Sequence, residues 1–278
     1  MQKAPPHPQR DPQMTSLALI TGRGALPSAL VQALPERPYI CVLDGFLPDD
    51  LTPDLTFRLE RLVPFLRHLE DQGITRVAFA GQVTRPRLDP SLFDAATAQL
   101  VPQLMQAFAA GDDATLRAVI GLFEDGGFTV EGTETLAPQL LPQAGVLAGE
   151  LPPYAEADAA RAAQIVAALG AADVGQGCVV SSGLCLGVEA LPGTDIMLAQ
   201  VANLPDAMRP DHRGLYFKAA KPGQDRRVDL PTLGPATLNA VAAAGLGGIA
   251  FEAGSVICLD LPEMQARATG LGLFLWAR

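Results

Sequence analysis

The densest group of polar residues in the chain lies between Lys218 and Pro231, and its composition suits phosphate chemistry. The segment reads KAAKPGQDRRVDLP in a protein in which charged residues make up only 18%. Lys218, Lys221 and Arg226 could bind a diphosphate, while Asp225 could hold Mg²⁺ or orient a water molecule. The alternative is a solvated turn whose surface ion pairs contribute about 0–1 kcal/mol each. Because charge is scarce elsewhere, the sequence favours a functional loop.

A second candidate is the segment VEALPGTD at residues 188–195, which places two carboxylates beside a predicted helix start. Glu189 is expected to end a strand, and Thr194 is expected to cap the helix that follows the Pro-Gly turn. A capped helix start explains this pattern without any function. Alternatively, Glu189 and Asp195 supply further oxygen ligands for a metal ion held by Asp225.

The third candidate is the loop from Gly22 to Gly24, which separates a predicted strand from a predicted helix. Its glycines would let backbone N–H groups approach a phosphate closely. Asp44 follows the next predicted strand, 20 residues after Gly24, where a dinucleotide fold places its ribose-binding acid. Pro27, however, stands where the third glycine of GxGxxG belongs, so a tight turn explains the loop equally well.

Asp112, in the sequence GDD, would cap a helix start, and a contact with substrate is the alternative interpretation. Several other chemistries lack their motifs altogether. The chain has no GxSxG elbow, no Walker A lysine and no CxxC pair, and its three histidines are widely separated. A serine-hydrolase triad, a P-loop and a zinc site are therefore not expected.

Composition narrows the class of protein further. The net charge of −10 and the aromatic content of 5% argue against a nucleic-acid-binding protein. Residues 1–15 lack an apolar core and hold four prolines, so we expect a disordered tail rather than a signal peptide. No stretch approaches the roughly 20 apolar residues that span a bilayer, so a soluble protein is expected.

Short apolar runs alternate with helical patterns in the first half of the chain. Strands are predicted at 17–20, 39–43 and 76–80, and helices at about 89–109 and 113–125. This alternation indicates an α/β fold with a parallel sheet covered by helices on both faces. The second half predicts a mixed sheet, with a hairpin turning at Ser182-Gly183.

The predicted organisation is therefore two α/β domains. Its parts are the tail at 1–15, a Rossmann-like domain at 16–136, a proline-rich linker at 137–157, and a mixed-sheet C-terminal domain at 158–278.

Six of these segments, taken in order, point to a known family. They are LALITGRGALP (17–27), RVAFAG (76–81), GDDATLR (111–117), DVGQ (173–176), VEALPGTD (188–195) and KAAKPGQDRRVDLPTLG (218–234). Together they resemble the UDP-2,3-diacylglucosamine pyrophosphatases of lipid A biosynthesis, of the type unrelated to calcineurin-like phosphoesterases. The resemblance runs from Leu17 nearly to the C-terminus.

This resemblance implies a Mg²⁺-dependent hydrolase, with Mn²⁺ as a substitute, that cleaves a diphosphate bound between two α/β domains. The implied products are UMP and 2,3-diacylglucosamine 1-phosphate (lipid X), with water attacking the sugar-side phosphate and Asp225 as the key catalytic carboxylate. We assign Lys218 and Arg226 to the phosphates. Further substrate contacts are expected from Lys221, Gln224, Thr194 and Asp112, and from Gly22, Gly24 and Asp44 on the uridine side.

The expected partner is a lipid-linked sugar nucleotide, not a nucleic acid. We also expect a cytoplasmic protein in transient contact with the inner membrane, and a homodimer is one oligomeric state left open. Two other functions are considered. A nucleotide-dependent oxidoreductase would use Gly22, Gly24 and Asp44, and would carry bound NAD(P). A non-catalytic sugar-nucleotide- or lipid-binding protein would bind the substrate without metal-dependent turnover.

Overall fold

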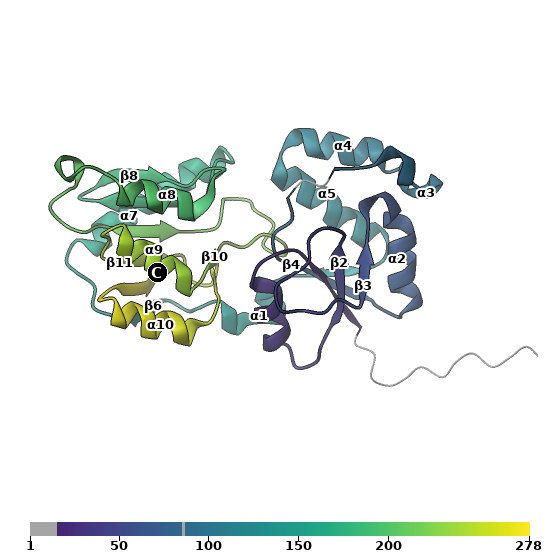
Figure 1. The fold of residues 1–278 in the computed structure, drawn as a ribbon, viewed down its shortest axis with the longest axis horizontal. Helices are drawn as coiled ribbons and strands as arrows, with labels where there is room; N and C mark the ends of the chain where they lie inside the picture. Colours follow the sequence, from purple (N-terminus) through teal and green to yellow (C-terminus); the bar gives the residue numbers. More distant parts are fainter. Residues whose placement is uncertain (1–15, 85–86) are drawn as a thin grey trace, which may run out of the picture. The chain divides into compact units, whose positions relative to one another are not determined.

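The computed structural model describes residues 16–84 and 87–278, apart from the side chains at 110, 112 and 113. The tail expected at 1–15 lies outside these residues. The chain divides into two units, Met1–Glu131 and Gly132–Arg278 (Figure 1). Within the described residues, no helix has the length and apolar character needed to cross a membrane.

The N-terminal unit is built on a five-stranded sheet in the order β3-β2-β1-β4-β5, with every neighbouring pair parallel. Its strands are β1 (Leu17–Thr21), β2 (Tyr39–Leu43), β3 (Leu55–Phe57), β4 (Arg76–Ala80) and β5 (Thr129–Glu131). This is the strand order of a Rossmann-like doubly wound sheet, so the predicted fold class is confirmed.

The helices of this unit are α1 (Leu26–Ala33), α2 (Leu62–Asp71), α3 (Ala95–Ala98), α4 (Val101–Ala110) and α5 (Asp112–Asp125). The single helix predicted at 89–109 is wrong, because the segment forms a short 3₁₀ turn followed by α3 and α4. The Asp94 side chain accepts hydrogen bonds from the N–H groups of Ala96 and Thr97, which starts a new helix there. Pro102, in the first turn of α4, starts another.

The C-terminal unit contains a six-stranded mixed sheet in the order β6-β13-β11-β9-β7-β8. The strands are β6 (Gly145–Ala148), β7 (Gly177–Ser181), β8 (Leu184–Val188), β9 (Leu215–Lys218), β11 (Gly248–Phe251) and β13 (Phe274–Ala277), with β10 (Thr232–Leu233) and β12 (Ile257–Cys258) forming a separate pair. Strands β9, β11 and β13 are parallel, whereas β6 and β7 run antiparallel to their neighbours β13 and β9. The predicted mixed sheet is therefore confirmed.

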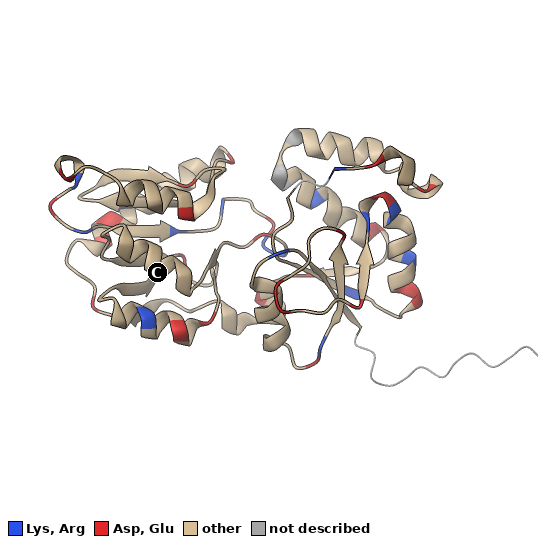
Figure 2. Ribbon diagram, viewed as in Figure 1, with Lys and Arg blue, Asp and Glu red and all other residues tan. Residues whose placement is uncertain are grey.

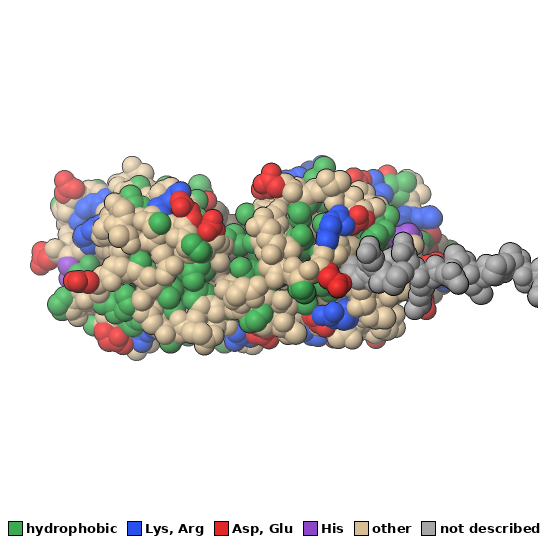
Figure 3. All heavy atoms as spheres, turned by 90° about the horizontal axis from the view of Figure 1, so that it is seen from below, with side chains coloured by type: hydrophobic (Ala, Val, Ile, Leu, Met, Phe, Trp, Pro, Cys, Tyr) green, Lys and Arg blue, Asp and Glu red, His purple; other side chains and the backbone are tan. Residues whose placement is uncertain are grey.

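Helices cover both faces of this sheet (Figure 1). The helices of this unit are α6 (Thr133–Leu136), α7 (Ala155–Ala171), α8 (Gly193–Ala202), α9 (Pro235–Ala243) and α10 (Leu261–Gly270). Apolar side chains of α8, α9 and α10 pack on one face of the sheet, and those of α7 pack on the other. Few charged residues lie on the strands (Figure 2), and on the face seen in Figure 3 the exposed hydrophobic side chains form several small groups.

The hairpin of β7 and β8 turns at Ser182 and Gly183, as predicted. Both residues have positive φ, 53° and 74°, which is typical of the type I′ turn that suits a twisted hairpin. The buried carboxylate of Asp158 accepts hydrogen bonds from both turn amides, at 3.2 and 2.8 Å. This carboxylate therefore holds the turn against α7.

The segment predicted as a linker is in part a strand. Residues 145–148 form β6, which pairs antiparallel with β13 at one edge of the C-terminal sheet. Pro142 and Pro152 flank this strand without interrupting it, which an edge position tolerates. The strand is too short to show a hydrophobic period, so its proline-rich surroundings dominate the sequence pattern.

Candidate active site

Several candidate residues meet where strands β9 and β11 of the C-terminal sheet end, which we call the carboxyl edge of the sheet. Strand β9 ends at Lys218, and its parallel neighbour β11 is followed by Glu252. The antiparallel β7 begins at Gly177, opposite Lys218, and β8 ends just before Glu189. Open α/β sheets place their ligands at the carboxyl ends of the parallel strands, so this edge is the candidate site.

A buried polar cluster occupies this edge. Glu189 Oε2 accepts hydrogen bonds from Thr194 Oγ1 at 2.7 Å and from Tyr216 OH at 3.1 Å. Lys218 Nζ lies 3.5 Å from the same oxygen and 3.1 Å from Thr194 Oγ1. A buried charge is costly unless it is paired and hydrogen-bonded, and this arrangement meets both conditions. The cluster therefore fixes a lysine ammonium at the end of β9.

Tyr216 is the member of this cluster that the sequence did not indicate. Its side chain is fully buried in the core, and only the hydroxyl reaches the site. Burial and the nearby carboxylate of Glu189 raise the pKa of Tyr216 well above its usual range, so the hydroxyl stays a donor. In the sequence, Tyr216 is one apolar residue of a buried strand, and nothing distinguishes it.

Two glycines after α7 allow the chain to pass over the cluster. A Cβ on Gly175 would lie 2.0 Å from the backbone oxygen of Glu189. A Cβ on Gly177 would lie 2.7 Å from Tyr216 OH and 2.8 Å from Glu189 Oε2. These positions explain the DVGQG segment physically, because only glycine leaves room for such close approach.

Thr194 and Asp195 lie in the first turn of α8, two residues later in the helix than predicted, because the N-cap is Pro192. The helix begins at Gly193, and Thr194 makes no capping bond because its hydroxyl is directed to Glu189. The predicted capping role of Thr194 is therefore wrong. Asp195 is exposed in the same turn.

The charged loop between β9 and β10 is anchored by the side chains that were expected to bind phosphate. Lys221 Nζ lies 2.8 Å from Asp173 Oδ1, and Arg226 Nε lies 3.2 Å from Glu134 Oε2. Arg226 also donates to the backbone oxygen of Gly254. In this structure Lys221 and Arg226 thus hold the loop in place, and their contact with phosphate stays a prediction.

Asp225 lies on an ordered turn within this loop and is paired with Arg227. Arg227 Nε lies 2.9 Å from Asp225 Oδ1, and Arg227 Nη2 lies 2.7 Å from Asp225 Oδ2. The backbone N–H of Arg227 donates to Oδ1 as well, at 3.1 Å. Gln224 donates to Asp229 and accepts from the backbone N–H of Lys221, which further orders the turn.

The three predicted metal ligands do not gather into one site. Across residues 16–84 and 87–278, no group of three or more His, Cys, Asp or Glu side chains is arranged to hold a metal ion. Glu189 belongs to the Lys218 cluster, and Asp195 is exposed. Mg²⁺, however, commonly binds through one or two carboxylates together with substrate phosphates, and the hard oxygens of Asp225 fit that mode.

The glycine loop of the N-terminal unit packs tightly against a second loop. Gly22 N donates to Ala80 O at 2.8 Å, and Arg23 and Gln82 form an antiparallel bridge. A Cβ on Gly22 would lie 2.5 Å from the backbone oxygen of Gln82. This close approach accounts for Gly22, whereas Gly24 has φ +91° with open space around it. The tight-turn interpretation therefore explains the first glycine without a nucleotide.

Asp44 follows β2 in the same unit, where a ribose-binding acid was expected. Its Oδ2 lies 2.7 Å from Arg58 Nη1, and half of its side chain is exposed. Asp112 begins α5, but its side chain lies outside the described residues. The binding roles of Gly22, Gly24, Asp44 and Asp112 stay predictions.

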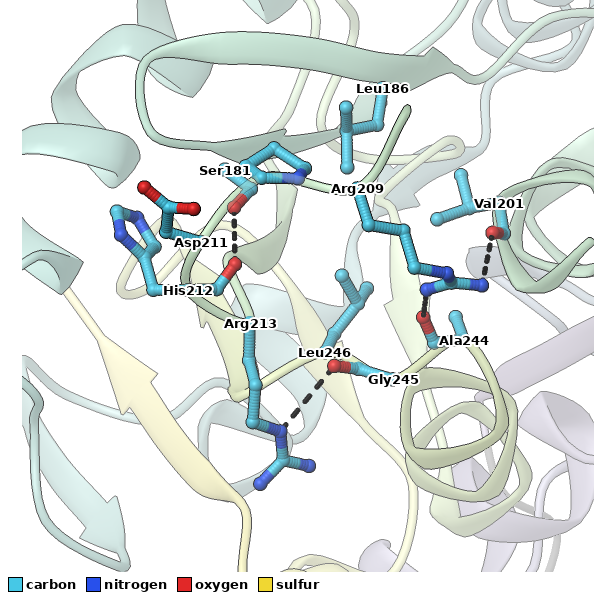
Figure 4. A pocket seen from close by; sticks show the side chains of 11 residues that line it. Ser181, Leu186, Val201, Arg209, Asp211, His212, Arg213, Ala244, Gly245 and Leu246 are labelled. Atoms are coloured by element: carbon cyan, nitrogen blue, oxygen red, sulfur yellow. Dashed lines mark hydrogen bonds between the residues drawn. The ribbon is translucent and has the colours of Figure 1, made fainter. Parts of the chain in front are cut away.

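A pocket of about 190 Å³ opens at the opposite edge of the C-terminal sheet (Figure 4). Arg209 donates to the carbonyls of Val201 and Ala244, near the ends of α8 and α9, so its charge stabilises two helix C-termini. These hydrogen bonds explain why Arg209 lies partly buried beside the pocket, without a bound ligand.

Ser182, His212 and Asp158 come together beside this pocket, but not as a hydrolase triad. The Ser182 hydroxyl lies 3.3 and 3.5 Å from the two ring nitrogens of His212. Asp158 Oδ2 lies 3.0 Å from Nε2 of the same ring. Because the hydroxyl is nearly equidistant from both ring nitrogens, it is not aligned with the lone pair of either, as the serine of a triad is.

Comparison with known proteins covers both units. Residues 16–140 match the family described as LpxI N-terminal domain, and residues 143–276 match the LpxI C-terminal domain. The UDP-2,3-diacylglucosamine pyrophosphatase LpxI of Caulobacter vibrioides (strain ATCC 19089 / CIP 103742 / CB 15) is 39% identical over 273 residues, which are 94% of this chain and 97% of that protein. The resemblance seen in the motifs is thereby confirmed, and the chain belongs to the LpxI family.

Proposed function

We propose that this protein hydrolyses the diphosphate of UDP-2,3-diacylglucosamine to UMP and 2,3-diacylglucosamine 1-phosphate. One observation carries the proposal. Lys218 is buried and paired with Glu189 at the end of β9, and this strand leads directly into the loop that contains Asp225. The relative that bears this activity in its name aligns with 94% of the chain. Both the residues and the family therefore support the same reaction class.

Lys218 is suited to bind a phosphate oxygen. An ammonium has three N–H donors, and here two are directed to Thr194 and Glu189, so the third can donate to substrate. The surrounding burial strengthens such a charge-assisted hydrogen bond, because little water competes for it. Thr194 and Glu189 also prevent the lysine side chain from moving, so its position does not depend on substrate.

Asp225 supplies the carboxylate of the reaction in this proposal. We propose Mg²⁺ as the cofactor, with Mn²⁺ as a substitute, held by Asp225 together with diphosphate oxygens. When bound, the ion supplies positive charge that neutralises the diphosphate and the departing phosphate. Asp225 then either holds the ion or orients the attacking water, and its turn fixes it for either role.

The direct test is to incubate the purified protein with UDP-2,3-diacylglucosamine and Mg²⁺ and to measure UMP. We expect release of UMP that stops with EDTA and returns with Mg²⁺ or Mn²⁺. Binding of the substrate without release of UMP would contradict the proposal and support a non-catalytic binding protein. Bound NAD(P) in the purified protein would support the oxidoreductase alternative.

The proposed attack is at the phosphate next to glucosamine, with UMP as the leaving group, as the family resemblance implies. Hydrolysis in ¹⁸O-labelled water, followed by mass spectrometry of both products, checks this directly. Label in the lipid 1-phosphate is expected. Label in UMP would place the attack at the uridine-side phosphate instead.

We also propose a cytoplasmic protein in transient contact with the membrane that holds its diacylated substrate. Two apolar side chains near the buried cluster, Leu191 and Ile196, are 97% and 51% exposed, and such side chains suit contact with lipid. Sedimentation with phospholipid vesicles, compared between the wild type and Leu191→Ser, tests the contact. A homodimer stays a prediction that light scattering can check.

A further inference from the structure

The ion pair between Asp225 and Arg227 occupies both oxygens of the proposed catalytic carboxylate. The guanidinium meets it through two N–H groups, at 2.9 and 2.7 Å, in the planar fork that matches a carboxylate. The side chains are 19% and 35% exposed, so solvent and ligands can reach the pair. The backbone beneath it is closely packed, because a Cβ on Gly132 would lie 2.7 Å from the Arg227 Cα. The turn is thus fixed, while the guanidinium lies at the surface.

The guanidinium and a divalent cation compete for the same carboxylate lone pairs. A guanidinium also binds phosphate in the same two-pronged manner, so a diphosphate can replace Asp225 as its partner. After such an exchange, Asp225 would hold the cation and Arg227 would bind the diphosphate. The charges of the four groups cancel, since the diphosphate carries two negative charges and the cation two positive ones.

We propose that Arg227 is a positioning residue that holds Asp225 in the free protein and moves to a phosphate oxygen of the substrate. The consequence is that Asp225 binds a divalent cation tightly only when a diphosphate is present. This inference rests on the proposed function. It accounts for the pairing of Asp225 with an arginine in a structure whose described residues include no group of three or more His, Cys, Asp or Glu side chains that could hold a metal ion.

The neighbouring Arg226 provides a matched control. It carries the same charge in the same loop, but it pairs with Glu134 and with the Gly254 carbonyl. Arg226→Gln therefore removes one positive charge near the site and leaves the Asp225 pair in place. Any effect of general electrostatics will be shared by Arg226→Gln and Arg227→Gln, whereas release of Asp225 is expected only from Arg227→Gln.

The experiment measures Mn²⁺ binding to the full chain by the electron paramagnetic resonance signal of free Mn²⁺. Without nucleotide, we expect Arg227→Gln to bind Mn²⁺ about tenfold more tightly than the wild type and Arg226→Gln to resemble the wild type, an effect typical of coupling between sites. With UDP-N-acetylglucosamine, the wild type is expected to gain affinity and Arg227→Gln to gain little. Asp225→Asn, measured with the same nucleotide, reports the Mn²⁺ that the nucleotide binds alone.

Equal affinity of the folded Arg227→Gln variant and the wild type would overturn the inference. If that variant does not fold, the wild type still decides, because tight Mn²⁺ binding without nucleotide that Asp225→Asn abolishes would overturn it. That outcome leaves the proposed function intact. Failure of the wild type to release UMP from UDP-2,3-diacylglucosamine with Mg²⁺ would instead overturn the proposed function.

Discussion

The ammonium of Lys218 and the carboxylate of Glu189 lie 3.5 Å apart at the carboxyl edge of the C-terminal sheet, with 8% and 10% of their side chains exposed. Neither group is stable alone in such a place, because an unpaired buried charge costs several kcal/mol. Their neighbours Thr194 and Tyr216 satisfy further donors and acceptors. Under the proposed function, stability and phosphate binding therefore depend on the same pair.

We expect Glu189→Gln to lower the free energy of unfolding by about 3–5 kcal/mol, because it leaves Lys218 buried without a counter-charge. The double variant Glu189→Gln/Lys218→Met is expected to lose less than the sum of the two single variants. Urea denaturation of the four proteins gives the coupling energy. Glu263→Gln is the control, because its partner Arg267 is a half-exposed neighbour on α10 and the loss should be about 0.5 kcal/mol or less. Strict additivity at Glu189 and Lys218 would contradict this prediction.

Asp225→Asn is expected to reduce UMP release by about 10²-fold or more, since the change removes the charge and keeps the shape. The unfolding free energy should fall by only about 0–1 kcal/mol, because the lost ion pair with Arg227 is partly exposed. Initial rates and thermal denaturation of the same preparation check both parts. Turnover comparable to the wild type would show that another residue supplies the carboxylate.

Gly177→Ala is expected to destabilise the C-terminal unit by about 1–3 kcal/mol, because the new methyl group would meet the Tyr216 hydroxyl and Glu189. Adding Tyr216→Phe should recover part of this loss by removing the nearest atom. Gly121→Ala in α5 is the matched control, since nothing lies within 4 Å of its Cβ position. There we expect a gain of about 0.4–1 kcal/mol. If Gly177→Ala left the free energy of unfolding unchanged, Tyr216 and Glu189 would be able to move away from the methyl group, contrary to this prediction.

Cys185 is expected to be the most reactive thiol among the described residues. Hydrogen bonding from Cys178 lowers the pKa of Cys185 to about 6, whereas burial raises the pKa of Cys41 to about 12. The thiolate of Cys185 should therefore predominate above pH 6 and decline as the pH falls through that value. Alkylation by iodoacetamide, followed by peptide mass spectrometry across pH, measures the midpoint.

Cys178→Ala removes the hydrogen bond and should move this midpoint upward, toward the ordinary thiol value. Cys258→Ala is the control, because that buried cysteine lies in the other core cluster of the sheet and should leave the midpoint unchanged. An unchanged midpoint in Cys178→Ala would show that another group sets the pKa.

The strands that the sequence predicted well are those buried on both sides. Tyr39–Leu43 and Arg76–Ala80 agree residue for residue, because continuous apolar runs are typical of interior parallel strands. The strands β3, β5 and β6 were missed, since each has only three or four residues and is defined by its pairing partner. Such strands have no periodic signal of their own.

The sequence identified many of the residues in the site, but it did not identify which side chains contact one another. Glu189 and Thr194 were selected from one segment and Lys218 from another, and the structure brings them together. The contacts of each side chain depend on the direction in which its own strand or loop places it, and the sequence does not show that direction. Glu189 was predicted to bind a metal ion, but in the structure it lies beside Lys218. Arg226 and Arg227 are adjacent and chemically identical, and only the fold shows which of them contacts Asp225.

Strand β7 pairs antiparallel with β9, and correct folding depends on the register between these two strands. Gly177 lies opposite Lys218, and side chains alternate between the two faces of a sheet. A shift of β9 by one residue would turn Phe217 toward the polar cluster and direct the Lys218 ammonium into the apolar layer beneath α7. The electrostatic penalty of that misalignment far exceeds the small differences in backbone pairing between neighbouring alignments. Lys218 thus helps to set the register of β9 during folding, before any substrate is bound.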